Sequence, residues 1–538
     1  MSTARPPIAI VGGGPVGLTV ANLLAARDVP VVLVERNAST SDEAKAISLD
    51  DESLRTLEAA DLAEAVLATV VPGTGTRYYD RHGRPLFHAR GPRQNRLGYP
   101  FKNQFAQPEL ERVLLDALKS RPQAHVRFAT ELVEVLDHGD TIEVGLRPAG
   151  SEGPSREFLP AAWVLGCDGG RSTVRELCGI AMNGVSHNDL WLVVDTIEDP
   201  HDERYGMHRG TPERPTVIVP GRDGRCRYEF RLYDGEAVKG DQPSFELVSK
   251  LIAPYRPLAR EQVERCVTYT FNAVVAVSWR KGRCLLLGDA AHMMPPFAGQ
   301  GLNSGIRDAA NLAWKIGEVW HRRATDDLLD TYEAERAPNA KAMVGFSQQL
   351  GAVVMTTSRL RAFIRDLAVR ATLATRPGRR YLAEMRFRPA ARHSAGLVFG
   401  NHPLTGTQLP QPCVLVAPRL HLRPLDEVLG DGLSILGIDV SDAWWRLIDA
   451  EPWDNAAWLR GRIDVRLGDR LPRPAEGRQA VADADGRLQE ALGSAQGQFV
   501  LVKPDRYIAA VFGPKDIRTA AEAMRKFLGQ PRVEGTQP

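Results

Sequence analysis

A glycine-rich turn near the N-terminus constrains the fold more than any other feature of the sequence. Gly12, Gly14 and Gly17 follow the apolar run 8–11 and lead into an alanine- and leucine-rich run at residues 18–26. A strand, a tight glycine turn and a helix place free backbone N–H groups and the positive end of the helix where a pyrophosphate can bind. The first glycine allows the turn, the second lets a phosphate approach the backbone, and the third lets the helix pack on the strand. The turn therefore predicts a dinucleotide-binding α/β fold.

A carboxylate at the end of the next strand supports this interpretation. Residues 31–34 form a second apolar run, which ends in Glu35, about twenty residues after the glycines, where an acid binds a ribose hydroxyl. Glutamate rather than arginine at this place disfavours a bound adenosine 2′-phosphate. The glycines alone also fit an ordinary turn of an α/β protein, but strand, helix and acid together favour dinucleotide binding.

Composition and charge indicate the number of domains and exclude several classes of partner. The 538 residues exceed what one core supports, so two or three domains are expected. A net charge of +2, without a long basic run interleaved with aromatics, argues against nucleic acid as a partner. No apolar run reaches the length of a membrane span, and residues 1–7 leave no room for a secretory signal. We therefore expect a protein of the cytoplasm with no membrane partner. The six cysteines show neither a CxxC pair nor metal-ligand spacing, so reduced thiols and no metal site are expected.

Two later segments also join apolar strands to glycines. Residues 163–167 lead into Asp168 and Gly169, and residues 284–287 lead into Gly288 and Asp289. The glycine-rich stretch 299–303 then opens a helix whose N–H groups would stabilise an anionic ring in front of it. Ligands of open α/β sheets bind at such strand ends. Each segment taken singly has an ordinary structural explanation, but the first and last glycine stretches together predict a flavin.

These motifs resemble the flavin-dependent aromatic hydroxylases, the class A single-component monooxygenases of the p-hydroxybenzoate hydroxylase type. The glycine turn with its acid, the Asp168–Gly169 segment and the stretch from Gly288 to Asn303 match that family in order and approximate spacing. The resemblance covers nearly the whole chain. Residues 50–56, 330–333 and 384–387 carry most of the similarity to members that act on 3-(3-hydroxyphenyl)propionate.

The resemblance implies a reaction in which the cofactor does most of the chemistry. Its cofactor would be FAD, with NADH or NADPH as a transient co-substrate and O2 as the oxidant. The implied reaction is the ortho-hydroxylation of a small phenol, 3-(3-hydroxyphenyl)propionate or 3-hydroxycinnamate, to a catechol through a flavin C4a-hydroperoxide. One alternative is a hydroxylase of a polycyclic polyketide or antibiotic. Another, from a different class, is a non-catalytic flavin-binding scaffold or sensor.

The resemblance also assigns roles to single residues. Pro296 would lie beside the substrate ring, and the amides of Leu302 and Asn303 would face the flavin N1 and C2 carbonyl, which makes these three the predicted catalytic residues. Lys45 stands where relatives usually carry arginine, and lysine lacks the planar two-pronged donor. The predicted cofactor-binding residues are Gly12, Gly14, Pro15, Val16, Gly17, Glu35, Arg36, Lys45, Gln107, Asp168, Gly169, Asp289, Gly299, Gly301, Leu302 and Asn303.

The small aromatic substrate is assigned five candidate residues from the strand-rich middle of the chain and the loop after it. A propionate needs a cation, which Arg214 or Arg231 could supply. His208 and Tyr228 could hydrogen-bond a phenol, and Met294 could line an aromatic pocket. Ordinary alternatives are solvated arginines, a structural histidine and tyrosine, and a methionine in the core.

The predicted fold class is α/β, with a Rossmann-like FAD-binding domain into which a strand-rich substrate domain is inserted. The FAD-binding domain is expected at residues 1–180 and 270–375, and the insert at 181–269. A linker at 376–412 leads to a C-terminal domain at 413–538 that resembles the thioredoxin-like domain of longer family members. That domain lacks a CxxC motif and holds only Cys413, so a structural or oligomer-forming role is expected. A homodimer is one of the assemblies this would allow.

Overall fold

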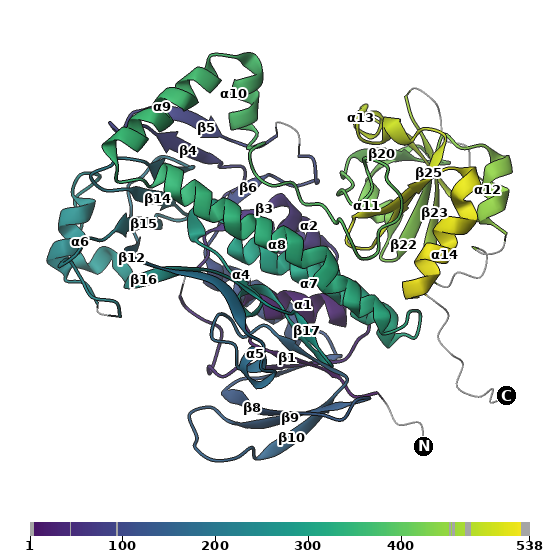
Figure 1. The fold of residues 1–538 in the computed structure, drawn as a ribbon, viewed down its shortest axis with the longest axis horizontal. Helices are drawn as coiled ribbons and strands as arrows, with labels where there is room; N and C mark the ends of the chain where they lie inside the picture. The colour runs from purple at the N-terminus through teal and green to yellow at the C-terminus, as the bar shows by residue number, and fades with distance from the viewer. Residues whose placement is uncertain are drawn as a thin grey trace.

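The computed structural model describes residues 5–43, 45–92, 95–240, 242–450, 453, 458–468 and 475–528. The ends of the predicted first and last domains, 1–4 and 529–538, lie outside this set. Figure 1 shows a large body built from the first three quarters of the chain and a smaller C-terminal body packed beside it. No described helix combines the length and the apolar character needed to cross a bilayer.

A six-stranded sheet forms the centre of the large body. Its order is β17-β18-β11-β1-β2-β7, and all neighbours pair in parallel except β17 with β18. The central strands are buried along their whole length, as expected for a parallel sheet covered on both faces. The strands are β1 (Ile8–Val11), β2 (Val31–Val34), β7 (Ala124–Arg127), β11 (Trp163–Gly166), β17 (Arg280–Lys281) and β18 (Cys284–Leu286). The helices α1 (Pro15–Ala25), α4 (Gln107–Lys119) and α7 (Gly301–Trp320) pack together, α1 against both others.

Two smaller sheets extend this centre. An antiparallel sheet, β10-β9-β8, lies at the bottom of Figure 1. A two-stranded sheet joins β3 (Ser48–Asp50), which precedes α2 (Asp51–Glu58), to β6 (Lys102–Gln104). The strands of the three-stranded sheet are β8 (Thr130–Asp137), β9 (Ile142–Pro148) and β10 (Glu157–Ala161). Short helices α3 (Ala63–Leu67) and α5 (Thr173–Leu177) complete this part.

An eight-stranded sheet holds the strand-rich middle of the chain. Its order is β19-β16-β12-β15-β14-β13-β4-β5, so strands from residues 76–89 join those of the region predicted at 181–269. The strands are β4 (Thr76–Tyr79), β5 (Pro85–Ala89), β12 (Met182–Thr196), β13 (Gly206–Arg209), β14 (Thr216–Pro220), β15 (Cys226–Arg231), β16 (Val263–Ala276) and β19 (His292–Met293). One face packs a core that includes Tyr228, Phe230 and Ile252 of α6 (Phe245–Ile252). The other face carries Tyr78, Trp191 and Val217, which belong to a second core with Val354 and Met385.

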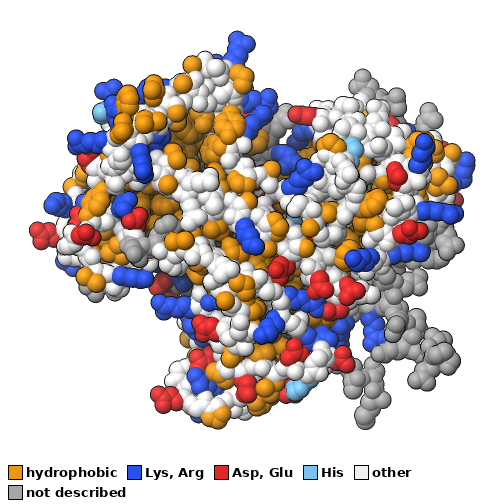
Figure 2. All heavy atoms as spheres, in the orientation of Figure 1, with side chains coloured by type: hydrophobic (Ala, Val, Ile, Leu, Met, Phe, Trp, Pro, Cys, Tyr) orange, Lys and Arg blue, Asp and Glu red, His pale blue; other side chains and the backbone are white. Residues whose placement is uncertain are grey.

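Long helices cover the large body. Helix α8 (Asp327–Val354) runs across its front in Figure 1, and α9 (Arg359–Leu373) and α10 (Arg376–Ala383) lie at the top beside β4 and β5. Helix α10 therefore occupies the start of the segment predicted as a linker. Figure 2 shows Lys and Arg mixed with Asp and Glu over the visible face, in keeping with the small net charge.

The C-terminal body is an α/β unit around a seven-stranded sheet of order β21-β20-β24-β23-β22-β25-β26. Strands β22, β23 and β24 are parallel, β25 pairs antiparallel with β22, and β26 pairs antiparallel with β25. The strands are β20 (Cys413–Val416), β21 (His421–Pro424), β22 (Leu433–Ile438), β23 (Leu459–Arg466), β24 (Gln479–Asp483), β25 (Gln498–Val502) and β26 (Ile508–Phe512). The helices are α11 (Leu425–Leu429), α12 (Asp442–Ile448), α13 (Arg487–Leu492) and α14 (Ile517–Leu528).

Buried charges hold the two bodies together. Glu335 of α8 accepts hydrogen bonds from Lys315 of α7 at 2.9 Å and from Lys503 of the C-terminal body at 2.8 Å. All three side chains are fully buried. Burial alone would raise the pKa of Glu335, but Lys315, Lys503 and His393 hold it well below its usual range. A second buried pair joins Arg55 of α2 to Asp426 of α11 at 2.6 Å. The relative placement of the two bodies therefore depends on paired charges without contact with water.

We expect Glu335→Gln to destabilise the protein by about 3–5 kcal/mol, because two buried ammonium groups lose their counter-charge. Urea unfolding of the FAD-loaded protein, followed by circular dichroism, measures the loss. Glu427→Gln is the matched control, since Glu427 forms an exposed pair with Arg423 that is worth about 0.5 kcal/mol or less. Equal stability of the two variants would contradict the role given to Glu335.

Candidate active site

A cavity of about 790 Å³ lies between the carboxyl ends of the central parallel strands and the inner face of the eight-stranded sheet. Val11, Glu35, Cys167 and Gly288 line it at the ends of β1, β2, β11 and β18. Its opposite end is lined by residues of β4, β6, β13, β14 and β15: Thr76, Lys102, Gln104, Gly206, His208, Val217, Val219, Arg227 and Glu229. One cavity therefore joins the dinucleotide motif to the strand-rich region.

Glycine packing forms the first end of this cavity. Gly12 has φ 106°, and a Cβ there would lie 2.5 Å from the Cys167 carbonyl oxygen. A Cβ on Gly17 would lie 2.0 Å from the Gly12 oxygen, so Gly17 packs behind the turn and does not line the cavity. Gly14 differs, because it lines the cavity and a Cβ there would meet no atom within 4 Å. Helix α1 begins after Gly14 without a side-chain cap, which leaves its positive end open toward the cavity.

Glu35 fixes the edge of the dinucleotide end. Its Oε2 accepts a hydrogen bond from the Gly13 amide at 2.6 Å, and its Oε1 accepts one from the Asn37 amide at 2.8 Å. The carboxylate is therefore held in place by backbone donors. Arg36 lines the cavity beside it, as do Pro15 and Val16 at the start of α1.

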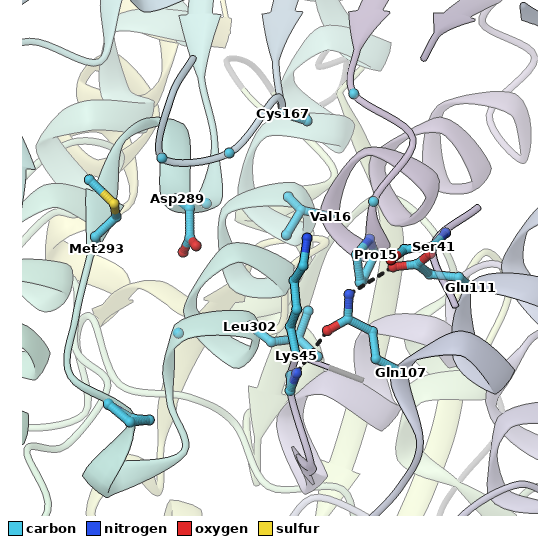
Figure 3. A pocket seen from close by; sticks show the side chains of 18 of the residues that line it. Pro15, Val16, Ser41, Lys45, Gln107, Glu111, Cys167, Asp289, Met293 and Leu302 are labelled. Carbon is cyan, nitrogen blue, oxygen red and sulfur yellow. Dashed lines mark hydrogen bonds between the residues drawn. The ribbon is translucent and has the colours of Figure 1, made fainter. Parts of the chain in front are cut away.

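A side-chain relay anchors the loop that carries Lys45. Gln107 accepts from the Ala46 amide and donates to Glu111, both at 2.8 Å, and Glu111 accepts from the Ser41 amide at 3.0 Å. Figure 3 shows this relay on one side of the cavity and Lys45 reaching across it. The polar atoms of Gln107 thus hold the loop, while Lys45 remains exposed with its Nζ 3.8 Å from Glu43.

Two carboxylates lie at the middle of the cavity. Asp168 accepts from the Ser172 hydroxyl at 2.5 Å and from the Val174 amide at 3.1 Å, so it braces the start of α5. Gly169, with φ 79°, brings backbone to the cavity wall. Figure 3 shows Asp289 pointing into the open space. Burial raises the pKa of both carboxyl groups.

The loop before α7 forms the far wall. Pro296, Gly299, Gly301 and Leu302 line the cavity, and α7 starts without a side-chain cap. Within the described chain, the N–H groups of Gly301, Leu302 and Asn303 have no acceptor. Two of these donors, on Gly301 and Leu302, belong to residues that line the cavity at a positive helix end, which suits a ring that becomes anionic.

Asn303 acts through its side chain in a way that the sequence did not indicate. Its Oδ1 accepts from the Asp50 amide at 2.9 Å and from the Ser53 hydroxyl at 2.8 Å. Its Nδ2 donates to the Ser48 and Gly299 carbonyls at 2.9 and 2.7 Å. The side chain therefore ties β3 and α2 to the start of α7, and Asn303 itself is buried and does not line the cavity.

The structure brings two of the five predicted substrate residues to the cavity, His208 and Met294. Tyr228 precedes the cavity-lining Glu229 on β15, so it points to the opposite face, where it donates to Asp199 at 3.0 Å. Arg214 pairs with Glu236 at 2.5 Å and Arg231 with Asp189 at 2.6 Å, both away from the cavity. The placement of these three residues does not favour contact with a substrate.

The sequence analysis named His208 at this end but missed Lys102, Arg227 and Glu229. Burial and the nearby Lys102 lower the pKa of His208 to about 3, so its imidazole is neutral. Burial raises the pKa of Glu229 to about 7, an effect that Arg227 opposes. His208, Val217 and Glu229 lie opposite one another on β13, β14 and β15 and therefore share one face of the sheet. The register between strands brings these residues together, and their spacing in the sequence does not reveal that register.

Aromatic side chains close this end of the cavity. Phe297 contacts Trp191 and Phe271, with ring centroids 5.4 and 5.1 Å apart, and Tyr78 packs edge-on against His208 at 5.1 Å. Met293 and Asn272 line the wall nearby. Phe297, Met293 and the two valines of β14 thus form an apolar wall beside the polar side chains of this end, a mixture that small-molecule sites usually have.

Comparison with known proteins identifies the class. A family model described as an FAD binding domain matches residues 5–347, and one described as the HcaD C-terminal domain matches residues 406–527. The chain belongs to this family of FAD-binding aromatic hydroxylases and is a flavin-dependent monooxygenase. The predicted family, enzyme class and cofactor are thereby confirmed.

Individual relatives agree with this class. The chain is 37% identical over 436 residues to a 3-(3-hydroxyphenyl)propionate/3-hydroxycinnamic acid hydroxylase of Mycolicibacterium smegmatis, covering 80% of this chain and 76% of the relative. It is 34% identical to a second enzyme of that name from Burkholderia vietnamiensis, over 98% of both chains.

Among solved structures, the anhydrotetracycline hydroxylase OxyS from Streptomyces rimosus matches with a TM-score of 0.74 at 25% identity, over 98% of this chain and all of that one. An aklavinone-11 hydroxylase with FAD and aklavinone matches in fold, with a TM-score of 0.76 at 23% identity, over 98% of this chain and all of that one. The predicted α/β fold class is confirmed.

The residues present fit FAD. The open space at Gly14, the fixed carboxylate of Glu35 and the unpaired N–H groups of α7 form one continuous surface that a long dinucleotide can follow. Bound there, FAD supplies the redox chemistry with NAD(P)H and O2.

We expect Gly14→Ala to fold normally and to bind FAD about 5- to 100-fold more weakly. Gly14 has φ −76° and ψ −178°, which alanine adopts without strain, and its methyl would fill space meant for ligand, an overpacking of about 1–3 kcal/mol. Fluorescence titration of FAD into the apoprotein measures the affinity. Gly345→Ala, also in open space but on α8, is the control. Unchanged FAD affinity in Gly14→Ala would place the pyrophosphate elsewhere.

Proposed function

We propose that the enzyme ortho-hydroxylates a small phenol that carries a carboxylate side chain, 3-(3-hydroxyphenyl)propionate or 3-hydroxycinnamate, to a catechol. The observation that carries this proposal is the continuity of one cavity from the dinucleotide motif to the chamber under the eight-stranded sheet. The names of the relatives support the substrate class. NADH or NADPH acts as a transient reductant.

The size of the cavity favours a one-ring substrate. About 790 Å³ must hold both FAD and substrate, and the cluster of Phe297, Trp191 and Phe271 stands at the chamber wall. The polyketide hydroxylases that share the fold act on larger molecules, so hydroxylation of a polycyclic polyketide stays the second candidate. Relative turnover of one-ring and polycyclic phenols separates the two.

The protein contributes binding, orientation and exclusion of water. The amides of Leu302 and Asn303 would stabilise negative charge on the cofactor ring, and Pro296 would set the plane in which the phenol lies. The apolar wall around Phe297 keeps water from the reacting atoms, which limits release of hydrogen peroxide. Neutral His208 can accept a hydrogen bond from a phenol and so increase the electron density of its ring.

The C-terminal body is proposed to be a thioredoxin-like domain with a structural role. Its β22-α12-β23 unit, the β25-β26 hairpin and α14 follow the order of such a domain. Its buried charge pairs with α2 and α8, and the hydrogen bond that Asp505 accepts from Asn311 of α7, support a role in holding the large body. All six cysteines have free thiols, in keeping with a cytoplasmic location.

Purified FAD-loaded enzyme should oxidise NADH faster with 3-(3-hydroxyphenyl)propionate than without it and should release a catechol. Oxygen uptake, NADH absorbance and chromatography of the product, with hydrogen peroxide quantified in parallel, measure the two fates of the reductant. A panel with phenol, 3-hydroxycinnamate and a polycyclic phenol ranks the substrates. The proposal fails if no phenol both speeds oxidation and is hydroxylated.

Cys413→Ser should leave hydroxylation and stability unchanged, because Cys413 is the sole cysteine of residues 413–538 and its side chain is exposed. Product formation in the presence and absence of a thiol reductant tests this. Loss of activity in Cys413→Ser that a reductant does not restore would point to a direct role of this thiol.

A further inference from the structure

Lys102 is a partly buried cation that lines the substrate chamber. It lies on β6, lines the cavity, and its Nζ donates to the Thr76 hydroxyl at 2.6 Å. Among the described residues, no carboxylate oxygen lies within 4.0 Å of Nζ. Burial and the nearby guanidinium of Arg388 lower the pKa of Lys102 to about 8. Ammonium groups are rarely buried without an acid.

The surroundings of Lys102 do not provide that acid. From β13 it faces His208, which is neutral, and from β4 it faces the Thr76 hydroxyl. Asp50 lies across from it on β3, but its carboxylate is already bound by Arg307 and by Arg388. Lys102 thus has a hydroxyl partner and positive or neutral neighbours, an arrangement that an anionic ligand would complete.

Strand pairing connects Lys102 to the start of α7, and residues of both line the same cavity. On β6, Gln104 pairs with Ser48, whose carbonyl accepts from Asn303 at the start of α7. Lys102 lies two residues back along β6 from Gln104, about 7 Å at the usual rise of a strand. Lys102 therefore lies on the strand next to β3, which the side chain of Asn303 ties to the start of α7.

We propose that Lys102 binds the carboxylate of the substrate and so selects phenols with an anionic side chain. This assignment rests on the proposed function, and it replaces Arg214 and Arg231, whose charges are paired outside the cavity. The Thr76 hydroxyl orients the ammonium through their hydrogen bond. The carboxylate would also neutralise the ammonium of Lys102, whose charge is unfavourable away from water. The surroundings of Lys102 therefore favour an anionic ligand.

The test compares two ligands in the FAD-loaded enzyme, 3-(3-hydroxyphenyl)propionate and the uncharged 3-propylphenol. Lys102→Met should raise the Kd and KM for the carboxylate about 10- to 100-fold, the usual effect of losing a hydrogen bond to a charged group. The values for 3-propylphenol should change little. Lys102→Arg should restore much of the carboxylate affinity. Lys281→Met, which removes a lysine that donates to the Cys178 carbonyl away from the cavity, is the matched control.

The pH profile gives a second readout. Only protonated Lys102 attracts an anion, so the Kd for the carboxylate should rise as the pH increases through about 8. The Kd for 3-propylphenol should not follow this titration below the pKa of its own phenol. In Lys102→Arg the rise should disappear, because a guanidinium stays protonated.

Three outcomes would overturn the assignment. Equal weakening of both ligands in Lys102→Met would mean a structural role or contact with the phenol oxygen. Unchanged carboxylate binding in Lys102→Met, or a loss of carboxylate binding in Arg231→Gln instead, would place the carboxylate elsewhere. Calorimetric binding is measured separately from turnover, so absence of hydroxylation with intact, Lys102-dependent binding would count against the proposed function alone.

Discussion

Close packing of glycines at one point supports the rest of this structure. The turn at Gly12, the turn at Gly288 and the first turns of α7 meet because side chains are missing there. A Cβ on Gly305 would lie 2.6 Å from Val16 of α1 and 3.1 Å from the Gly288 backbone. Segments almost 300 residues apart in the chain can therefore bring two uncapped helix ends to the same cavity. Those two positive ends make the site suitable for a long, anionic cofactor.

The second body of the protein reaches this site through buried polar contacts. Tyr507 donates to Glu52 at 2.7 Å, and Glu52 pairs with Arg307, which lies one turn beyond the start of α7. Arg307 also pairs with Asp50, whose amide donates to Asn303. The C-terminal body thus supports the helix end that faces the cofactor ring. Such paired, buried groups hold a position firmly because any shift leaves a charge without its partner.

The sequence predicted the cofactor end of the site well and the substrate end poorly. Glu35, Asp168 and Asp289 follow directly after strands that the apolar runs identify, and the carboxyl ends of parallel strands meet at one edge. Glu229 comes instead from the eight-stranded sheet and Lys102 from the two-stranded sheet of β3 and β6, so the neighbours of both depend on the register between strands. A shift of one residue moves a side chain to the other face, which is why Tyr228 points away from the cavity.

The sequence by itself determined the flavin-binding fold, the class of chemistry and the residues that follow each glycine motif, because these depend on local backbone geometry and on order along the chain. The tertiary structure decided which cations are free to bind a substrate. Arg214 and Arg231 have the right charge, but each lies beside an acid, whereas Lys102 is partly buried in the cavity wall and donates to a hydroxyl. The sequence shows which side chains are charged, but their ion pairing and burial arise only when distant strands have come together in the fold.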